Sequence, residues 1–299
     1  MAETIRENRV GEGKTPVSSM RLPVHSIAVG VILACYASGR VLQVLHGPPA
    51  IVTLVAMEVL SAFALALVDG ARAWGVRGIL VFTGICAVVG NVVENVGVAT
   101  GFPFGRYQFL QVMGPKLHSV PVLLGLAYIG MAYASWTLGS ALVGGGSGRR
   151  FGVRLFAVPL VAACFLTAWD LAQDPVWSTM LHAWAWWDGG RWFGVPLQNY
   201  FGWLLNVFVI FVLFALYEAG ARLKPAPSAW PALALYLLCA GGNVLQLLTR
   251  PYPALSVDAS GRVWRTADIL LASALVSILV MGGLAAAAAA KMWKSDASF

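Results

Sequence analysis

Charged side chains are scarce in this sequence. Only 11% of the 299 residues are Asp, Glu, Lys or Arg, whereas hydrophobic types make up 59%. A soluble domain carries about 25% charged and about 45–50% apolar residues, so the composition excludes an ordinary soluble enzyme and a disordered chain. A membrane-spanning helix needs about 20 apolar residues, because it rises 1.5 Å per residue through roughly 30 Å of hydrocarbon. The sequence therefore predicts an all-α integral membrane protein.

Residues that bind metals or act as nucleophiles are also rare. The four histidines, His25, His46, His118 and His182, form no HxxxH or HxxHH pair, which argues against a membrane di-iron enzyme and a metalloprotease. The four cysteines fall in apolar runs and form no CxxC, so neither a disulfide framework nor a zinc site is predicted. A Walker loop and a GxSxG motif are missing too. We therefore expect no metal and no cofactor.

Negative charge is the scarcer sign, and the net charge is +7. The basic residues lie mostly between apolar runs, as in loops that face anionic lipid head groups, so nucleic acid is not an expected partner. Thirteen of the 20 Lys and Arg residues fall on the side of the N-terminal tail and seven on the opposite side. The positive-inside rule then predicts that both termini are cytosolic, in what we expect to be a bacterial cytoplasmic membrane.

Long apolar runs are what the sequence has in abundance. We expect about eight transmembrane helices, within a range of seven to nine, in a single domain over residues 22–290. Residues 1–21 are expected to form a disordered cytosolic tail without a signal-peptide pattern, and residues 291–299 a cytosolic C-terminal tail. The tryptophan-rich stretch 173–199 is predicted to lie at the membrane interface. The apolar runs are 22–45, 50–69, 77–99, 119–143, 153–172, 200–221, 229–248 and 266–290.

Polar side chains inside these runs gather in the half of the membrane that lies away from the termini. Such residues are costly in lipid and mark functional sites. Four of them are carboxyls that packing does not require, whereas Asp69 and Asp258 are expected to be solvated. The residues of this polar half are Arg40, Gln43, Glu58, Asn91, Glu94, Asn95, Asp170, Asp174, Asn199, Trp203, Asn206, Asn243, Gln246 and Asp268.

Carboxyls and aromatic rings within lipid suit acid–base chemistry on an apolar substrate. Burial disfavours the charged form of a carboxyl, so one carboxyl can stay protonated and protonate an electron-rich alkene. A second carboxylate or an Asn amide can position and deprotonate a water, which gives a tertiary alcohol. The same groups can also isomerise or cyclise a polyene. The aromatic faces that can hold the intermediate carbocation include Trp169, Trp177, Trp186, Trp203 and Tyr107.

Two other functions stay open at this point. Asp170 and Asp174 have a spacing that can bind Mg²⁺ and a diphosphate, as in an intramembrane prenyltransferase, although a second Asp-rich motif is missing. Intramembrane acids also suit a proton-coupled transporter, although no convincing two-fold repeat is evident. Asn243 and Gln246 can equally join helices by hydrogen bonds.

Two segments carry a family resemblance. Residues 90–109 read GNVVENVGVATGFPFGRYQF, and residues 168–205 read AWDLAQDPVWSTMLHAWAWWDGGRWFGVPLQNYFGWLL. Their ENxGxxTGxPFGxY and DLxxDP…GVPxxNxxGW cores resemble the carotenoid biosynthesis protein family, which includes the CruF-type carotenoid hydratases. The matching residues are Glu94, Asn95, Thr100, Gly101, Phe104, Gly105, Tyr107, Asp170, Asp174, Pro175, Gly194, Pro196, Asn199, Gly202 and Trp203.

The resemblance implies an activity and a substrate. It implies addition of water to the 1,2 double bond of an acyclic end-group of a C40 or C50 carotenoid, of the lycopene or γ-carotene type. It also implies an integral membrane protein without a known metal, and other carotenoid enzymes are further candidate partners. A carotenoid is a rod about as long as the bilayer is thick, so its end-group lies near one interface, as the polar cluster does.

The residues available for such a reaction can be given roles. We expect a carboxylic acid to donate the proton, a second carboxyl to support it, amides to orient the water, and two residues, Arg106 and Tyr107, to cap the mouth of the pocket. The predicted catalytic residues are Asp170, Asp174, Glu94 and Glu58, with Asp170 or Asp174 as the proton donor. The predicted substrate- and water-binding residues are Asn91, Asn95, Arg106, Tyr107, Asn199, Trp203 and Asn243, with Asn95 and Asn199 orienting the water.

Overall fold

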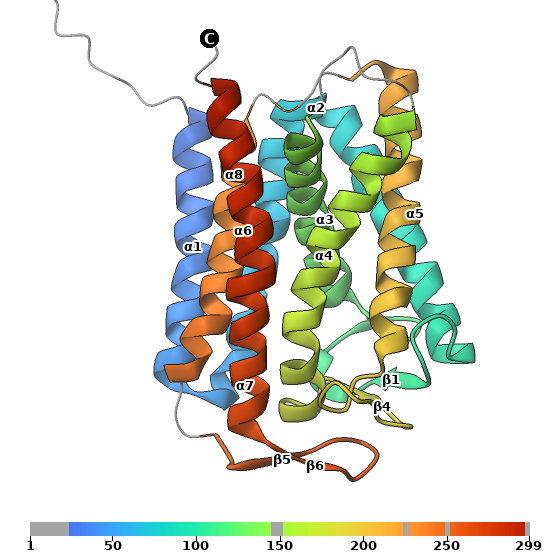
Figure 1. Cartoon of the computed structure of the whole chain (residues 1–299), viewed down its shortest axis with the longest axis vertical. Coiled ribbons are helices and arrows are strands. Elements are labelled where there is room, and N and C mark those ends of the chain that lie inside the picture. Colours follow the sequence, from blue (N-terminus) through green and yellow to red (C-terminus); the bar gives the residue numbers. More distant parts are fainter. Residues whose placement is uncertain (1–23, 145–151, 224–225, 227, 249–251, 297–299) are drawn as a thin grey trace, which may run out of the picture.

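The computed structural model describes residues 24–144, 152–223, 226, 228–248 and 252–296. The tail predicted over residues 1–21 lies outside the described residues, as do residues 297–299 of the predicted C-terminal tail. In the described part of the chain, seven helices are long and apolar enough to cross a membrane. Figure 1 shows them side by side in one bundle. This confirms the predicted all-α membrane fold, and the helix count is close to the expected eight.

The bundle is built from eight helical elements. They are α1 (Val24–His46), α2 (Pro48–Thr100), α3 (Val122–Val143), α4 (Val158–Pro175), α5 (Leu197–Ala221), α6 (Trp230–Leu245), α7 (Thr266–Leu275) and α8 (Gly282–Asp296). Short π-helical segments extend α4 at both ends and join α7 to α8, at Val153–Ala157, Val176–Met180 and Val276–Met281. Single 3-10 turns lie at Gln111–Met113 and Gln246–Leu248. Helix α8 ends at Asp296, so it includes the first six residues of the predicted C-terminal tail over 291–299.

Helix α2 accounts for the difference between seven helices and eight predicted spans. Its apolar part, Leu54–Thr100, has 47 residues, which is about 70 Å of helix and more than twice the roughly 30 Å of hydrocarbon. At Gly75 the backbone leaves helical geometry, with φ 73° and ψ 167°. Glycine adopts this region without the penalty of a side chain. The bend divides α2 into two arms that run in opposite directions (Figure 1), and it lies between the predicted runs 50–69 and 77–99.

Short antiparallel strand pairs form the connections. Strand β1 (Tyr107–Phe109) pairs with β4 (Trp184–Trp186), so that Tyr107 stands opposite Trp186. The other pairs are β2 (Lys116–Leu117) with β3 (Val120–Pro121), and β5 (Leu255–Val257) with β6 (Val263–Arg265). In Figure 1, β1, β4, β5 and β6 lie at the end of the bundle opposite the C-terminus. The predicted interfacial stretch 173–199 thus forms the last turns of α4, β4 and a loop at this strand end.

Helix α3 lies at the centre of the bundle, where it contacts α2, α4, α6 and α8. Small residues allow the closest approaches: a Cβ added at Gly130 would lie 2.8 Å from the Ala62 backbone, and one at Gly139 would lie 2.8 Å from Ala162. Close backbone approach at glycine is the usual way in which helices pack in lipid, where the hydrophobic effect supplies no attraction between them. These contacts hold α2 and α4 against α3 on either side of the site described below.

Two acidic residues that were expected to be solvated are buried, and those two predictions were wrong. Asp69 accepts a hydrogen bond from the Tyr133 hydroxyl at 2.6 Å and lies 3.1 Å from His25 Nε2. Asp258 accepts bonds from the Trp264 indole at 2.8 Å and from the loop around Ser260. Burial raises the pKa of Asp258, but these hydrogen bonds outweigh it and leave the pKa below the ordinary value. Both carboxyls are buried acceptors that hold local structure. The position of an Asp at the end of an apolar run or in a loop does not reveal this role.

Candidate active site

One face of α4 carries four residues that line a common cavity. Asp170, Gln173, Asp174 and Trp177 follow each other at intervals of three, one and three residues, so they point to the same side of the helix. The helix continues through the π-helical segment to Met180, beyond the predicted end at residue 172. This extension places all four on one rigid element. The cavity has a volume of about 90 Å³ and lies between α4, the first arm of α2, α1 and α3.

Asp170 and Asp174 lie at one end of the cavity and are joined by one amide. Asn199 Nδ2 donates to Asp174 Oδ2 at 2.5 Å and to Asp170 Oδ2 at 3.3 Å. Asn199 stands in the first turn of α5, which begins after Pro196, so a single helix start fixes the amide. The Trp184 side chain of β4 also hydrogen-bonds Asp174. The structure therefore brings three of the predicted residues together in one buried group.

Glu94 belongs to the same group, although it comes from the second arm of α2. Its carboxylate accepts hydrogen bonds from the hydroxyls of Tyr107 and Tyr128, the latter at 3.3 Å. Burial raises the pKa of the Tyr107 hydroxyl, and the nearby Glu94 raises it further, so Tyr107 stays neutral and acts as a donor. Asp170 is close enough to interact electrostatically with both Asp174 and Glu94. We call Asp170, Asp174 and Glu94 the carboxyl cluster.

The carboxyl cluster has no cation beside it in the described part of the chain. The ion pairs found there join His25 to Asp69, Arg40 to Glu58, and Arg106 to Asp188, so none involves a member of the cluster. The three side chains of the carboxyl cluster are each at most 5% exposed. Three buried carboxyls without a counter-ion are costly for stability, which indicates a role other than packing.

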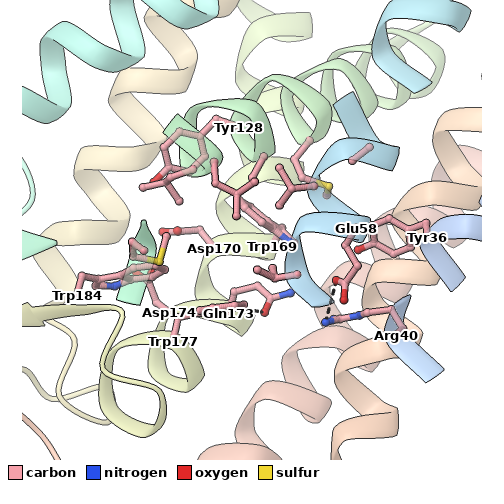
Figure 2. Close-up of a pocket in the computed structure, with 18 residues that line it drawn as sticks. Tyr36, Arg40, Glu58, Tyr128, Trp169, Asp170, Gln173, Asp174, Trp177 and Trp184 are labelled. Atoms are coloured by element: carbon pink, nitrogen blue, oxygen red, sulfur yellow. Dashed lines mark hydrogen bonds and ion pairs between the residues drawn. The ribbon is translucent and has the colours of Figure 1, made fainter. Parts of the chain in front are cut away.

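A second polar group occupies the other end of the cavity, as Figure 2 shows. Arg40 of α1 lies 3.1 Å from Glu58 of α2, and Gln43 donates a hydrogen bond to Glu58. Arg40 also donates to Asn243 Oδ1 at 2.6 Å, and Gln173 Nε2 donates to the same oxygen at 3.0 Å. Asn243 is thus the link between the Arg40–Glu58 pair and the α4 face that carries the acids.

Aromatic rings form part of the cavity wall and of the layer behind it. Tyr128 stands over Trp203 at 4.5 Å between ring centroids and meets Trp169 edge-on at 6.4 Å. Trp177 and Trp184 stack at 6.3 Å between ring centroids, and Trp184 also hydrogen-bonds Asp174. Trp203 itself is buried behind Tyr128 and Phe104. Trp169 and Trp177, expected as carbocation-stabilising rings, do line the cavity.

Three predicted binding residues have partners outside the cavity. Asn95 donates to the Asn91 backbone oxygen at 2.8 Å and accepts from the Ser119 backbone amide at 3.0 Å, so both asparagines hold the loop after α2. Arg106 is exposed and pairs with Asp188. The hydrogen bond and charge of Arg106 lower the pKa of Asp188. Their predicted roles in water binding and at the pocket mouth stay predictions.

Four of the polar side chains that line the cavity, Tyr36, Arg40, Tyr128 and Gln173, were not in the predicted set. Gln173 follows Asp170 by three residues, so helical spacing was a usable signal for it. Arg40 was visible as a charge within an apolar run. Tyr36 and Tyr128 lie in apolar helices with no local pattern that separates them from core tyrosines. Among the described residues, no group of three or more His, Cys, Asp or Glu side chains is placed to hold a metal ion.

Comparison with known proteins identifies the family. No solved structure matches the chain. A bisanhydrobacterioruberin hydratase of Haloarcula japonica is 30% identical over 178 residues, and this match covers 58% of the chain and 58% of the length of that relative. The sequence pattern of the carotenoid biosynthesis proteins matches residues 50–256, which is more than half of the chain and includes the whole carboxyl cluster. The chain therefore belongs to the carotenoid biosynthesis protein family.

Proposed function

We propose that this protein adds water to the terminal 1,2 double bond of an acyclic carotenoid end-group. The observation that carries the proposal is the buried carboxyl cluster without a cation, beside aromatic rings in an apolar cavity. The family gives the substrate class, and the name of the Haloarcula japonica relative supports hydration as the reaction. The proposed substrate is a carotenoid of the lycopene or γ-carotene type.

The carboxyl cluster supplies the proton. Three adjacent carboxyls cannot all be ionised in a low-dielectric site, because like charges at short range repel and the medium solvates them poorly. Asp170 and Asp174, which share the Asn199 amide, hold the proton that is transferred to the alkene. Glu94 is the partner carboxyl, kept in place by Tyr107 and Tyr128.

The same groups stabilise the cation that protonation creates. Adding a proton to the less substituted carbon of a trisubstituted alkene leaves a tertiary carbocation on its neighbour. The carboxylate left behind attracts this charge, and the faces of Tyr128, Trp169 and Trp177 add cation–π attraction. Because the walls are otherwise apolar, water enters only where polar groups hold it.

The position of the cavity fits a substrate dissolved in lipid. Trp184 of β4 lines it, so the cavity lies toward the strand end of the bundle. A rod-shaped carotenoid in the bilayer brings its end-group to one interface, where water is also at hand. The polyene part remains in the hydrocarbon, and only the reacting end enters the protein.

Expression in a host that makes lycopene, and in one that makes γ-carotene, tests this function. We expect pigments that gain the mass of one water for each acyclic end-group. An empty-vector strain provides the control for host enzymes. Unchanged pigments in both backgrounds, with the protein present in the membrane fraction, would contradict the proposal.

A further inference from the structure

The two ends of the cavity differ in chemistry. Figure 2 shows Asp170, Asp174 and Trp184 at one end and Glu58 and Arg40 at the other. All five line the same space. The first end carries acids without a counter-ion, whereas at the second end one carboxylate faces one guanidinium 3.1 Å away. An acid and a base can therefore act from opposite sides on a molecule between them.

Glu58 has the free acceptor capacity that a bound water needs. A carboxylate offers about four lone-pair sites. Gln43 donates to Oε1 and Arg40 to Oε2, which leaves further sites on a side chain that lines the cavity. An arginine side chain stays charged in proteins, so Arg40 pairs with the ionised form of Glu58. The ionised carboxylate can accept hydrogen bonds and act as a base.

The NH₂ groups of Asn199, Asn95 and Gln173 already have acceptors. Asn199 directs its NH₂ group to the two aspartates, and Asn95 is bonded to Asn91 and Ser119. Gln173 donates to Asn243 and accepts from the Trp177 indole. Apart from the two aspartates that hold the reacting proton, Glu58 is the carboxyl that lines the cavity, and its contacts leave acceptor sites for a reacting water.

Close packing against α6 fixes the position of Arg40. A Cβ added at Gly242 of α6 would lie 1.9 Å from Arg40 Nε, so glycine is needed for the guanidinium to reach Glu58 and Asn243. Arg40 also donates to the Cys239 backbone oxygen at 3.3 Å. Arg40 precedes residue 50 and therefore lies outside the region matched by the family pattern.

We propose, on the basis of the hydratase function above, that Glu58 and Arg40 form the water-binding subsite and that the two parts of water add to opposite faces of the alkene. The acid O–H bond of Asp170 or Asp174 breaks as the new C–H bond forms. The water oxygen then forms the C–O bond, and its proton passes to the Glu58 carboxylate. Water in the cavity returns that proton to the aspartates, so the enzyme ends each turnover unchanged.

The cavity has room for this arrangement. A water occupies about 10–15 Å³ of space measured in the same way, and the cavity has a volume of about 90 Å³. A flat alkene that enters between the two ends turns one face to the carboxyl cluster and the other to Glu58. The geometry thus leads to anti addition.

Stereochemistry in D₂O tests the proposal. The substrate is an acyclic carotenoid with ¹³C in one of the two methyl groups at its terminus, and the relative configuration of the two new centres is read by NMR. We expect one diastereomer, the product of anti addition. The syn product, or an equal mixture, would overturn this inference and leave hydration intact, whereas the absence of hydrated product would overturn both.

A pair of variants separates the two ends. In Glu58→Gln the acid end remains, so in D₂O we expect the hydrated product to fall at least 100-fold while deuterium enters the terminal carbons of unhydrated carotenoid. Asp174→Asn should give neither product nor deuterium. Asp69→Asn, which changes another buried carboxylate on the same arm of α2, should retain hydration. Absence of deuterium with Glu58→Gln, in protein that reaches the membrane as the wild type does, would overturn the assignment.

Discussion

At the scale of single residues, the site depends on carboxyls that have hydrogen-bond donors but no counter-ion. Asn199, Trp184, Tyr107 and Tyr128 all donate to the carboxyl cluster. Donors of this kind hold a carboxyl in place whether or not it is ionised, which an ion pair would not do. In the proposed reaction, the cluster therefore releases and regains a proton without rearrangement.

The first prediction concerns Asp174. Asp174→Asn keeps the size and polarity of the side chain but removes one of the two proposed proton donors, so hydration should fall by at least about 100-fold, to below detection, as expected for loss of a general acid. Glu94→Gln should have a similar effect. Pigment analysis by liquid chromatography and mass spectrometry, normalised to protein in the membrane, measures both.

Asp268→Asn is the matched control for this pair. Asp268 is exposed in the first turn of α7, away from the cavity, and its loss costs about 1 kcal/mol at most through the helix dipole. Asp268→Asn should give the same amount of hydrated product as the wild type. Wild-type product from Asp174→Asn and Glu94→Gln would remove the cluster from the mechanism.

At the scale of elements, close contacts along α3 set the distance between the helices that carry the site. The second prediction compares two glycines of this helix. Gly130→Ala should destabilise the protein by about 1–3 kcal/mol, because the new methyl group meets the Ala62 backbone, which cannot move aside as a side chain could. Gly125→Ala meets nothing within 4 Å and should be neutral or slightly stabilising.

Thermal unfolding in mild detergent, followed by fluorescence or by aggregation, checks this pair. The expected result is a lower transition temperature for Gly130→Ala alone. Equal transition temperatures would contradict the close packing of α3 against α2, in which a Cβ added at Gly130 lies 2.8 Å from the Ala62 backbone.

Sequence reasoning reaches elements and charged residues better than it reaches the cavity. Apolar runs predict the spans because lipid tolerates few charges, and even the bend at Gly75 falls between two predicted runs. Asp170, Asp174 and Glu94 could be selected because each charge in a span is costly. Tyr128 could not, because a tyrosine in an apolar helix looks the same whether it borders a cavity or a neighbouring helix.

Asn95 shows a second limit of the same reasoning. It follows Glu94 directly in the sequence, and both were predicted to act at the same site. A step of one residue turns a helix by about 100°, however, so Glu94 points to Tyr107 and Tyr128 while Asn95 reaches Ser119. The partners of each side chain come from segments distant in sequence, which spacing within one helix does not reveal.

At the scale of the whole molecule, the described chain begins and ends at the same end of the bundle, opposite the strand end that borders the cavity (Figure 1). The third prediction is that both termini are cytosolic and that the β5–β6 turn faces the other side. A fluorescent protein fused after Phe299 should fluoresce, and alkaline phosphatase inserted at Gly261 should be active. The reverse pattern would place the carboxyl cluster near the cytosolic face.

The origin of the added oxygen tests the central claim most directly. Membranes that contain the protein are incubated with an acyclic carotenoid in H₂¹⁸O, and the product is analysed by mass spectrometry. If the carboxyl cluster protonates the alkene and water captures the cation, each new hydroxyl carries ¹⁸O, and Asp174→Asn membranes give none. A product without ¹⁸O, or no hydroxylated product from the wild type, would contradict the account.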